Sequence, residues 1–418
     1  MSDLKERVRA WASEAKAAAA VLATVETRAK DAALSVIARE LRARTDDLLA
    51  ENARDVAAAE ARGTSVALLD RLRLTEARVE AMAAGVEEVI ALPDPVGGVE
   101  GLARRPNGLL VGRMRVPLGV IAMIYEARPN VAVDAAALTL KSGNAVLLKG
   151  GSEARHSNRA LATVLRDALA SAGLPAGAVT LIDETDRAVV EVLVTQDDLV
   201  DVVIPRGGEG LIRAVVEKAR VPVLQHYKGV CHAFVDQGAD LPQAATIVVN
   251  AKAQRPGVCN ALETLLVHRA EADAFLPLVA ARLAEKGVVL RGCPETCARV
   301  AAEPATDDDW AAEYLDLILA VRVVDDLEQA VAHIRTWGSR HTEAILTRDH
   351  ARAMRFLREV DASCVVVNAS TRFNDGNQLG LGAEIGISTT KLHAYGPMGL
   401  EELTTRKFVV FGEGQVRG

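Results

Sequence analysis

Short, wholly apolar runs alternate with amphipathic stretches through the middle of this chain. The apolar runs, at residues 120–124, 145–148, 178–182 and 199–204, have the length and composition of buried strands. The stretches between and after them, near 131–141, 156–172, 187–194 and 208–219, have helical spacing. Strands that are apolar on both faces and joined by helices are typical of a parallel sheet covered by helices on both sides. We therefore expect an α/β protein with a Rossmann-type, nucleotide-binding architecture.

A second alternation of the same kind follows residue 259, with strands predicted at 263–267, 317–321, 343–346 and 364–367. Residues 1 to about 90 are rich in Ala, Glu, Arg and Leu with helical spacing and predict a helical layer. Two α/β lobes should therefore meet near residue 250, and ligand sites favour such junctions and the carboxyl ends of parallel strands. The predicted domains are a cofactor domain with its helical layer (1–103 and 117–250), a catalytic domain (251–395) and an extended arm (104–116 and 396–418).

Composition excludes several classes of partner. The chain has 418 residues, 50% of them hydrophobic, a formal net charge of −7 and a pI near 5.7, with no basic patch that would indicate nucleic acid. No apolar run reaches the roughly 18 residues that span a bilayer, and the first residues lack a signal-type core, so a cytoplasmic protein without a membrane segment is expected. The five cysteines are expected to be reduced. Cys293 and Cys297 lack a second Cys or His pair nearby, so no metal is expected.

Cys259 ends a Gly257-Val258-Cys259 turn close to the predicted junction of the lobes. A turn at such a place can present a thiol to a ligand, as a nucleophile requires. Most free cysteines are instead small buried apolar residues. Cys259 is thus a candidate nucleophile whose role depends on the rest of the site.

Two features point to a phosphate-bearing ligand, although the usual Gly-x-Gly-x-x-Gly fingerprint is absent. Gly207 and Gly208 follow a predicted strand and open a predicted helix, so backbone N–H groups and a helix N-terminus can face a pyrophosphate. Such glycines equally often serve only to connect strand and helix. Lys149 ends another predicted strand, where a cation can reach a ligand, and the alternative is an ordinary surface lysine.

At this point the ordered set of motifs resembles the aldehyde dehydrogenase superfamily. The resemblance rests on Val116-Pro117-Leu118-Gly119-Val120-Ile121, the segment 141–149 and Gly257-Val258-Cys259. More narrowly, segments 124–131, 203–208 and 374–376 resemble the branch of that superfamily that reduces an acyl phosphate of glutamate. The resemblance covers nearly the whole chain. It implies an aldehyde dehydrogenase-like fold with a Rossmann-type cofactor domain, an α/β catalytic domain and a small β oligomerisation arm.

The same resemblance assigns roles by position. It makes Cys259 the nucleophile, Lys149 a contact to the adenosine ribose, and Glu313 the residue that holds the nicotinamide ribose, although the Phe-Gly-Pro that usually follows this glutamate is absent. NAD-preferring members often place a glutamate against the ribose 2′-hydroxyl where this chain has Ser152. Without that carboxylate a 2′-phosphate is not repelled, so NADP(H) is the expected cofactor, with Lys149 and Arg155 complementing its charge.

Two departures from ordinary aldehyde dehydrogenases bear on the reaction. An ungapped match puts Arg128 at the position of the oxyanion-stabilising asparagine, and Asn130 is the other candidate donor. An arginine there could bind a leaving phosphate in a bidentate manner.

His226 lies roughly where the general-base glutamate of ordinary aldehyde dehydrogenases would be. Since transfer to phosphate needs no base to activate water, the missing glutamate favours a phosphate-coupled reaction over hydrolysis. For His226 three roles remain open: a base, a phosphate contact or an ordinary hydrogen-bonded histidine.

Two late stretches rich in Gly, Asn and Ser, residues 368–376 and 380–389, lie where the resemblance implies binding of the amino-acid end of the substrate. Backbone N–H groups in such a loop can meet an α-carboxylate, and Glu384 or Asp375 could meet an α-ammonium. The residues expected to bind substrate are Arg128, His226, Asn368, Gly382 and Ala383. Any one of the loop residues could instead serve only to shape turns.

The resemblance implies reduction of L-glutamyl 5-phosphate to L-glutamate 5-semialdehyde and phosphate by NADPH through a Cys259 thioester, a step of proline biosynthesis. One alternative is an acylating aldehyde dehydrogenase that uses coenzyme A; another is a non-catalytic nucleotide-binding partner of glutamate kinase. Glutamate kinase is also a possible partner of the enzyme. The arm and the apolar run 404–411 predict a homodimer or homotetramer, because a bare apolar strand edge invites pairing.

Overall fold

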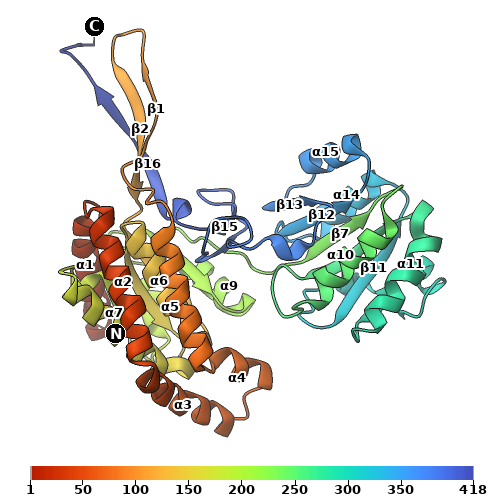
Figure 1. The fold of residues 1–418 in the computed structure, drawn as a ribbon, viewed down its shortest axis with the longest axis horizontal. Coiled ribbons are helices and arrows are strands. Elements are labelled where there is room, and N and C mark those ends of the chain that lie inside the picture. Colours follow the sequence, from red (N-terminus) through yellow and green to blue (C-terminus); the bar gives the residue numbers. More distant parts are fainter. Residues whose placement is uncertain (1, 418) are drawn as a thin grey trace. The chain divides into compact units, whose positions relative to one another are not determined.

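The structure, a computed structural model that describes residues 2–417, consists of two compact units (Figure 1). The N-terminal unit comprises the chain up to Gln225 together with Gly380–Gly386 and the C-terminal segment from Met398. The central unit comprises His226–Leu379 and Ile387–Pro397. The boundary at residues 225/226 therefore lies ahead of the predicted junction near residue 250.

A four-stranded parallel sheet forms the core of the N-terminal unit. Its strands lie in the order β5-β4-β3-β6. All six residues of β3 are buried, so both faces of the sheet are covered, as the apolar runs of the sequence predict. The strands are β3 (Val120–Tyr125), β4 (Ala145–Gly150), β5 (Val179–Leu181) and β6 (Val202–Arg206).

Helices cover this sheet and form the predicted N-terminal layer. Helix α1 packs against β3, β4 and β5, whereas α2 contacts α5, α6 and α7 (Figure 1). Buried lysines tie the layer together: Lys30 Nζ lies 2.8 Å from Asp94 Oδ2 and Lys141 Nζ lies 2.5 Å from Asp31 Oδ1. The helices are α1 (Ser2–Leu22), α2 (Thr27–Ala43), α3 (Thr45–Ala61), α4 (Val66–Leu72), α5 (Glu76–Ala91), α6 (Asn130–Lys141), α7 (Arg155–Ser171), α8 (Ala188–Leu193) and α9 (Glu209–Lys218).

Three antiparallel strands form an arm that extends from the helical part of this unit (Figure 1). They are β1 (Val99–Arg104), β2 (Leu110–Pro117) and β16 (Thr404–Phe411), with β16 paired to β2 along its whole length. The arm begins at Val99, a few residues before the predicted segment 104–116. Strand β16 exposes Phe408, Val410 and Phe411.

The central unit contains a seven-stranded parallel sheet in the order β10-β9-β11-β8-β7-β12-β13. One apolar cluster packs α10 and α11 on one face, and another packs α14 and α15 on the other. The strands are β7 (Cys231–Val235), β8 (Leu262–His268), β9 (Val289–Gly292), β10 (Glu303–Pro304), β11 (Ile318–Val324), β12 (Thr342–Leu346) and β13 (Cys364–Val367). The helices are α10 (Leu241–Ala253), α11 (Arg269–Ala284), α12 (Pro294–Cys297), α13 (Asp307–Trp310), α14 (Leu327–Trp337) and α15 (His350–Glu359). The short strands β14 (Gly386–Ser388) and β15 (Gly396–Met398) lie where the chain passes between units.

Aspartates cap three helices of the central unit. The side chains of Asp240, Asp326 and Asp349 accept the backbone N–H groups at the start of α10, α14 and α15. Each thereby satisfies an N–H that has no partner within its helix. Within the described part of the chain, no helix is both long enough and apolar enough to cross a membrane.

Asn144 is expected to be a stability determinant of the N-terminal unit. It is buried, its Nδ2 donates to Leu403 O at 2.9 Å, and its Oδ1 accepts the Gly119 N–H at 2.8 Å. The substitution Asn144→Ala leaves both backbone groups without this partner and should lower the free energy of unfolding by about 1–3 kcal/mol. Urea denaturation measures the change. The control Asn107→Ala removes one exposed bond to Leu109 N; equal stability of the two variants would contradict the prediction.

Candidate active site

Cys259 lies on the turn between α10 and β8 in the central unit. Its side chain is half-buried, and the turn is closed by the Ala261 N–H, which donates to Val258 O at 3.0 Å. Because β8 begins at Leu262, the sulfur lies at the amino end of the parallel sheet. The general preference of ligand sites for carboxyl ends, which we expected to hold here, does not apply to this unit.

Two imidazoles lie beside the sulfur. The candidate ligand atoms of His226, Cys259 and His341 all lie within 4.8 Å of one another, and the two rings meet edge to face at 5.3 Å. His226 Nδ1 donates to Ile387 O at 2.9 Å, so Nε2 is the proton-accepting nitrogen. His341 is buried, and its Nδ1 lies 2.8 Å from Thr342 Oγ1. The arrangement places a thiol next to groups that can take its proton.

The guanidinium of Arg372 places a positive charge close to the turn that carries Cys259. Burial and the Arg255 guanidinium lower the pKa of Arg372, while the charges of Asp375 and Cys259 oppose them. Arg372 Nε donates to Gln254 Oε1 at 2.9 Å, and its NH1 group contacts Asn260 Oδ1. The guanidinium therefore lies within electrostatic range of Cys259.

Backbone contacts fix the position of the turn on both sides. The Asn260 carbonyl accepts Thr371 Oγ1 at 2.7 Å, and Asn260 Nδ2 donates to Asn374 O at 2.9 Å. On the other side, a β-carbon added to Gly229 would lie 1.8 Å from Cys259 O. No side chain larger than hydrogen fits there without moving the turn.

Glu313, which we expected to hold the nicotinamide ribose, is part of this framework. Its Oε1 accepts the Gly229 N–H at 2.8 Å. The carboxylate therefore positions the backbone next to Cys259, and its contact with a ribose stays a prediction.

Cys231 forms a hydrogen bond with the turn that carries Cys259. Its thiol donates to Cys259 O at 3.2 Å, and complete burial raises its pKa well above the ordinary value. It therefore stays protonated and is not a second nucleophile.

Lys252, close to Cys259 in sequence, forms a buried ion pair with Glu263 at 2.7 Å. Burial raises the pKa of Glu263 to about 7.

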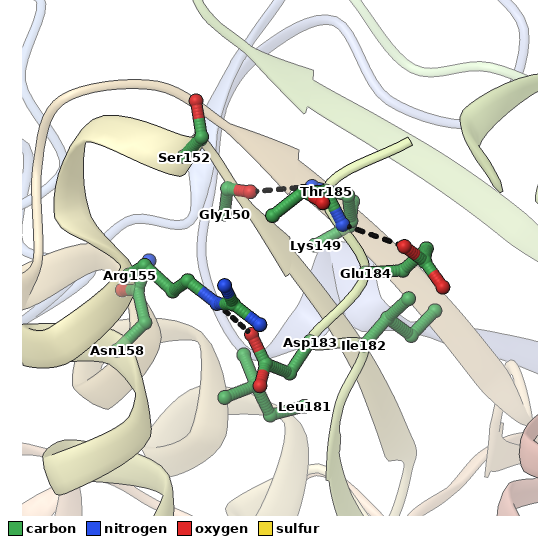
Figure 2. A pocket seen from close by; sticks show the side chains of 11 residues that line it. Lys149, Gly150, Ser152, Arg155, Asn158, Leu181, Ile182, Asp183, Glu184 and Thr185 are labelled. Carbon is green, nitrogen blue, oxygen red and sulfur yellow. Dashed lines mark hydrogen bonds and ion pairs between the residues drawn. The ribbon is translucent and has the colours of Figure 1, made fainter. Parts of the chain in front are cut away.

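A separate pocket in the N-terminal unit contains the predicted cofactor residues. It lies at the carboxyl ends of β4 and β5 and is lined by Lys149, Ser152 and Arg155 together with Asp183 and Glu184 (Figure 2). Ser152 is exposed and begins a short 3₁₀ turn. Lys149 Nζ donates to Gly150 O at 2.7 Å, and burial lowers its pKa.

Two arginines balance the acidic side of this pocket. Arg155 Nε donates to Asp183 Oδ1 at 2.8 Å, and Arg159 contacts the other carboxylate oxygen (Figure 2 shows Arg155 and Asp183). Burial alone would raise the pKa of Asp183, but the bonds from the arginines hold it below its usual value. The arginines therefore offset the negative charge of Asp183 on this side of the pocket.

The glycines predicted to hold the pyrophosphate lie at the N-terminus of α9. Gly208 is the N-cap residue, and its N–H donates to Glu126 Oε2 at 3.1 Å. A β-carbon on Gly207 would lie 2.5 Å from the same carboxylate oxygen. The helix N-terminus thus lies against the Glu126 carboxylate in this structure, and contact of these glycines with a pyrophosphate stays a prediction.

Asn130 and Arg128 line a second pocket of the N-terminal unit, together with Asp134, Arg206 and Glu384. Asn130 is the first residue of α6, and its Nδ2 donates to Asp134 Oδ2 at 2.9 Å. Burial raises the pKa of Asp134 to about 6, although the Asn130 amide and the Arg206 charge act against this. The two candidate donors for an oxyanion therefore share one pocket.

The remaining predicted substrate residues belong to different units of the chain. Asn368 has a positive φ of 54°, and its amide is bonded to both the N–H and the carbonyl of Thr347, at 2.9 and 2.8 Å. Gly382 and Ala383 belong to the N-terminal unit, where a β-carbon on Gly382 would lie 2.5 Å from the Leu92 side chain. In this structure Asn368 and Gly382 therefore shape the backbone, and their contact with substrate stays a prediction.

Sequence reasoning missed His341, Arg372 and Arg206. His341 was recognisable only as a histidine directly before a predicted strand, and Arg372 only as a cation within the Gly- and Asn-rich segment. Arg206 lies in the segment 203–208, in which only Gly207 and Gly208 were given a role. None of these positions carries a local pattern that distinguishes it from a surface residue.

Comparison with known proteins gives the family. The model of the aldehyde dehydrogenase family matches residues 2–291. The chain is 60% identical over 417 residues to the gamma-glutamyl phosphate reductase of Nitratidesulfovibrio vulgaris strain DP4, covering 99% of this chain and 100% of the relative. It is 57% identical over 417 residues to that of Geobacter metallireducens, covering 99% of each.

Comparison with solved structures gives the same fold. The crystal structure of gamma-glutamyl phosphate reductase from Thermotoga maritima has a TM-score of 0.96 at 47% identity, covering 98% of this chain and 100% of that one. The glyceraldehyde-3-phosphate dehydrogenase GapN of Methanocaldococcus jannaschii, complexed with NADP, shares the fold with a TM-score of 0.67 at 16% identity, covering 98% and 95%. The chain therefore belongs to the aldehyde dehydrogenase family and, within it, to the gamma-glutamyl phosphate reductases.

Proposed function

We propose that this chain reduces L-glutamyl 5-phosphate to L-glutamate 5-semialdehyde and phosphate with NADPH, a step in the synthesis of proline from glutamate. The observation that carries the proposal is the cluster of Cys259, His226 and His341, with its sulfur and nitrogens within 4.8 Å. It occurs in a chain that matches gamma-glutamyl phosphate reductases from end to end. A thiol beside imidazoles suits attack on an activated acyl group.

In the first step the Cys259 thiol gives its proton to His226 Nε2, and the thiolate attacks the acyl carbon of the substrate. His226 is suited to accept because its Nδ1–H already donates to Ile387 O. The positive charge of Arg372 lies within electrostatic range of Cys259. The carbon–oxygen bond to phosphate then breaks, the His226 imidazolium returns its proton to the departing phosphate, and a Cys259 thioester remains.

Bound NADPH supplies the hydride that reduces the thioester carbonyl. The C–S bond of Cys259 then breaks, the aldehyde leaves, and the thiolate regains a proton from solvent. One proton is therefore consumed per turnover. The residues that would hold the cofactor are Lys149, Ser152 and Arg155 in the pocket of the N-terminal unit, together with Gly207 and Gly208.

Two groups of the N-terminal unit are proposed to act on the acyl phosphate. The Asn130 amide carries two hydrogens, so it can donate to an oxyanion as well as to Asp134. Arg128, in the same pocket, has the planar fork that binds a phosphate through two hydrogen bonds. Asn368, Gly382, Ala383 and Glu313 remain proposed contacts of substrate or cofactor.

We also infer a homodimer or homotetramer. The exposed Phe408, Val410 and Phe411 on β16 support pairing of the arm with another copy of the chain.

We also propose a cytoplasmic location. The cysteines are free, as is usual for proteins kept under the reducing conditions of the cytoplasm.

The reaction is tested in the oxidative direction. NADP-dependent oxidation of glutamate 5-semialdehyde should require phosphate, because an acyl phosphate is the product, and Cys259→Ser should lower kcat by at least about 1,000-fold while NADPH binding is retained. Product formation is followed as NADPH absorbance. Oxidation that proceeds without phosphate but with coenzyme A would overturn the proposed substrate, and full activity of Cys259→Ser would overturn the proposed nucleophile.

Cofactor choice is tested at Ser152. A carboxylate introduced by Ser152→Glu should repel the 2′-phosphate and lower kcat/KM for NADPH by at least about 10-fold, equivalent to about 1.4 kcal/mol, without a matching loss for NADH. Ser152→Gln is the control of the same size without the charge. If both variants lose NADPH activity equally, the effect is steric and the electrostatic explanation is wrong.

The close approach of Gly229 to the nucleophile gives a third prediction. The β-carbon in Gly229→Ala must displace the Cys259 turn, and a displacement of about 1 Å is expected to lower kcat about 100-fold with little effect on KM for NADPH. In the control Gly85→Ala the new β-carbon meets nothing within 4 Å, so activity should be unchanged. A Gly229→Ala enzyme that folds and retains the original kcat would show that the turn position does not limit the reaction.

A further inference from the structure

We propose that His226, Cys259 and His341 form a reversible Zn²⁺ site in the enzyme without substrate, so that zinc blocks the nucleophile. These three side chains offer one thiolate and two imidazole nitrogens, all within 4.8 Å of one another. In a tetrahedral zinc site with bonds of about 2.0–2.3 Å, neighbouring ligand atoms are about 3.3–3.8 Å apart. Side-chain movements of about 1 Å therefore suffice to bring the three atoms onto one ion.

The ligand chemistry favours zinc over the common hard cations. Sulfur and imidazole nitrogen are preferred ligands of Zn²⁺, whereas Mg²⁺ and Ca²⁺ require oxygen. Three protein ligands and one open position match the form of exchangeable zinc sites rather than closed structural ones. On binding, Cys259 loses its proton to solvent and its sulfur bonds to the metal; no oxidation is involved.

The surroundings orient both imidazoles for a metal. The Nδ1–H of His226 donates to Ile387 O at 2.9 Å, which presents Nε2 as the ligand. His341 Nδ1 lies 2.8 Å from Thr342 Oγ1, so its Nε2 is the ligand expected there. Hydrogen bonds from the second ring nitrogen to a carbonyl or hydroxyl are the usual outer contacts of zinc-binding histidines.

Nearby positive charge keeps the binding reversible. The Arg372 guanidinium lies within electrostatic range of both Cys259 and Arg255, and its positive charge opposes a divalent cation at the sulfur. The affinity for the metal therefore comes from its bond to the thiolate and not from the surrounding charges. The inhibitory consequence rests on the proposed role of Cys259 as nucleophile, whereas metal binding rests on the geometry alone.

The other close cysteine pair supplies a control. Cys293 Sγ lies 3.3 Å from Thr296 Oγ1, and Cys297 Sγ donates to Gly292 O at 3.3 Å. Within the described part of the chain, these two cysteines belong to no group of three potential ligands. A Cys293→Ser/Cys297→Ser double variant should therefore bind zinc as the unchanged protein does.

The test is titration of the full-length, reduced protein with Zn²⁺, followed by isothermal calorimetry, and with Co²⁺, followed by its thiolate charge-transfer absorption. We expect one ion per chain, loss of the absorption in Cys259→Ala, and affinities at least about 10-fold weaker in both His226→Asn and His341→Asn. Zinc should also slow alkylation of Cys259 by iodoacetamide, and a chelator should restore the rate.

These measurements use no substrate, so they stand even if the proposed reaction fails. Stoichiometric binding that survives Cys259→Ala or disappears in the Cys293/Cys297 variant would overturn the site, as would the absence of binding. Should a histidine variant fail to fold, protein alkylated at Cys259 provides the same comparison, because it must lose the Co²⁺ absorption if the assignment is correct.

Discussion

The close contact between the Gly229 backbone and the Cys259 carbonyl is the constraint on which the rest of the central site depends. The segment after His226 and the turn before β8 can approach this closely only because residue 229 has no β-carbon. Glu313 holds the Gly229 N–H, and Cys231 donates to the same Cys259 carbonyl from the start of β7. His226 and the sulfur thus belong to one framework, so a change on either segment must move both.

This framework is built at the amino ends of β7, β8 and β12, whereas the cofactor pocket lies at the carboxyl ends of β4 and β5. At an amino end, the residues preceding each strand supply the functional groups: His226 before β7, Cys259 before β8 and His341 before β12. Because these strands are neighbours in the order β8-β7-β12, three segments far apart in the chain converge on one point. Parallel pairing therefore determines which side chains meet.

Most of the fold could be predicted from the sequence because buried parallel strands are locally recognisable. The four strands and the helices of the N-terminal sheet lie within a few residues of the predicted ranges. Strand β7 was missed because His232 interrupts its apolar run; the structure buries this histidine against Glu343 at 2.9 Å. The missing strand also explains why the boundary between the units was expected near residue 250. Cys259 and His226 carry local motifs, but His341 and Arg372 join them only through strand order, which no local pattern contains.

The two roles proposed for Cys259, nucleophile and metal ligand, both require a thiolate beside proton-accepting nitrogens. Arg372 acts differently on the two: its positive charge attracts an anion but repels a divalent cation. Its guanidinium is held by Gln254 and Asn260, so its charge cannot move away when a ligand enters. A fixed cation close to Cys259 would favour an anionic acyl phosphate over a metal ion at the same sulfur, so zinc binding at the proposed site should remain reversible.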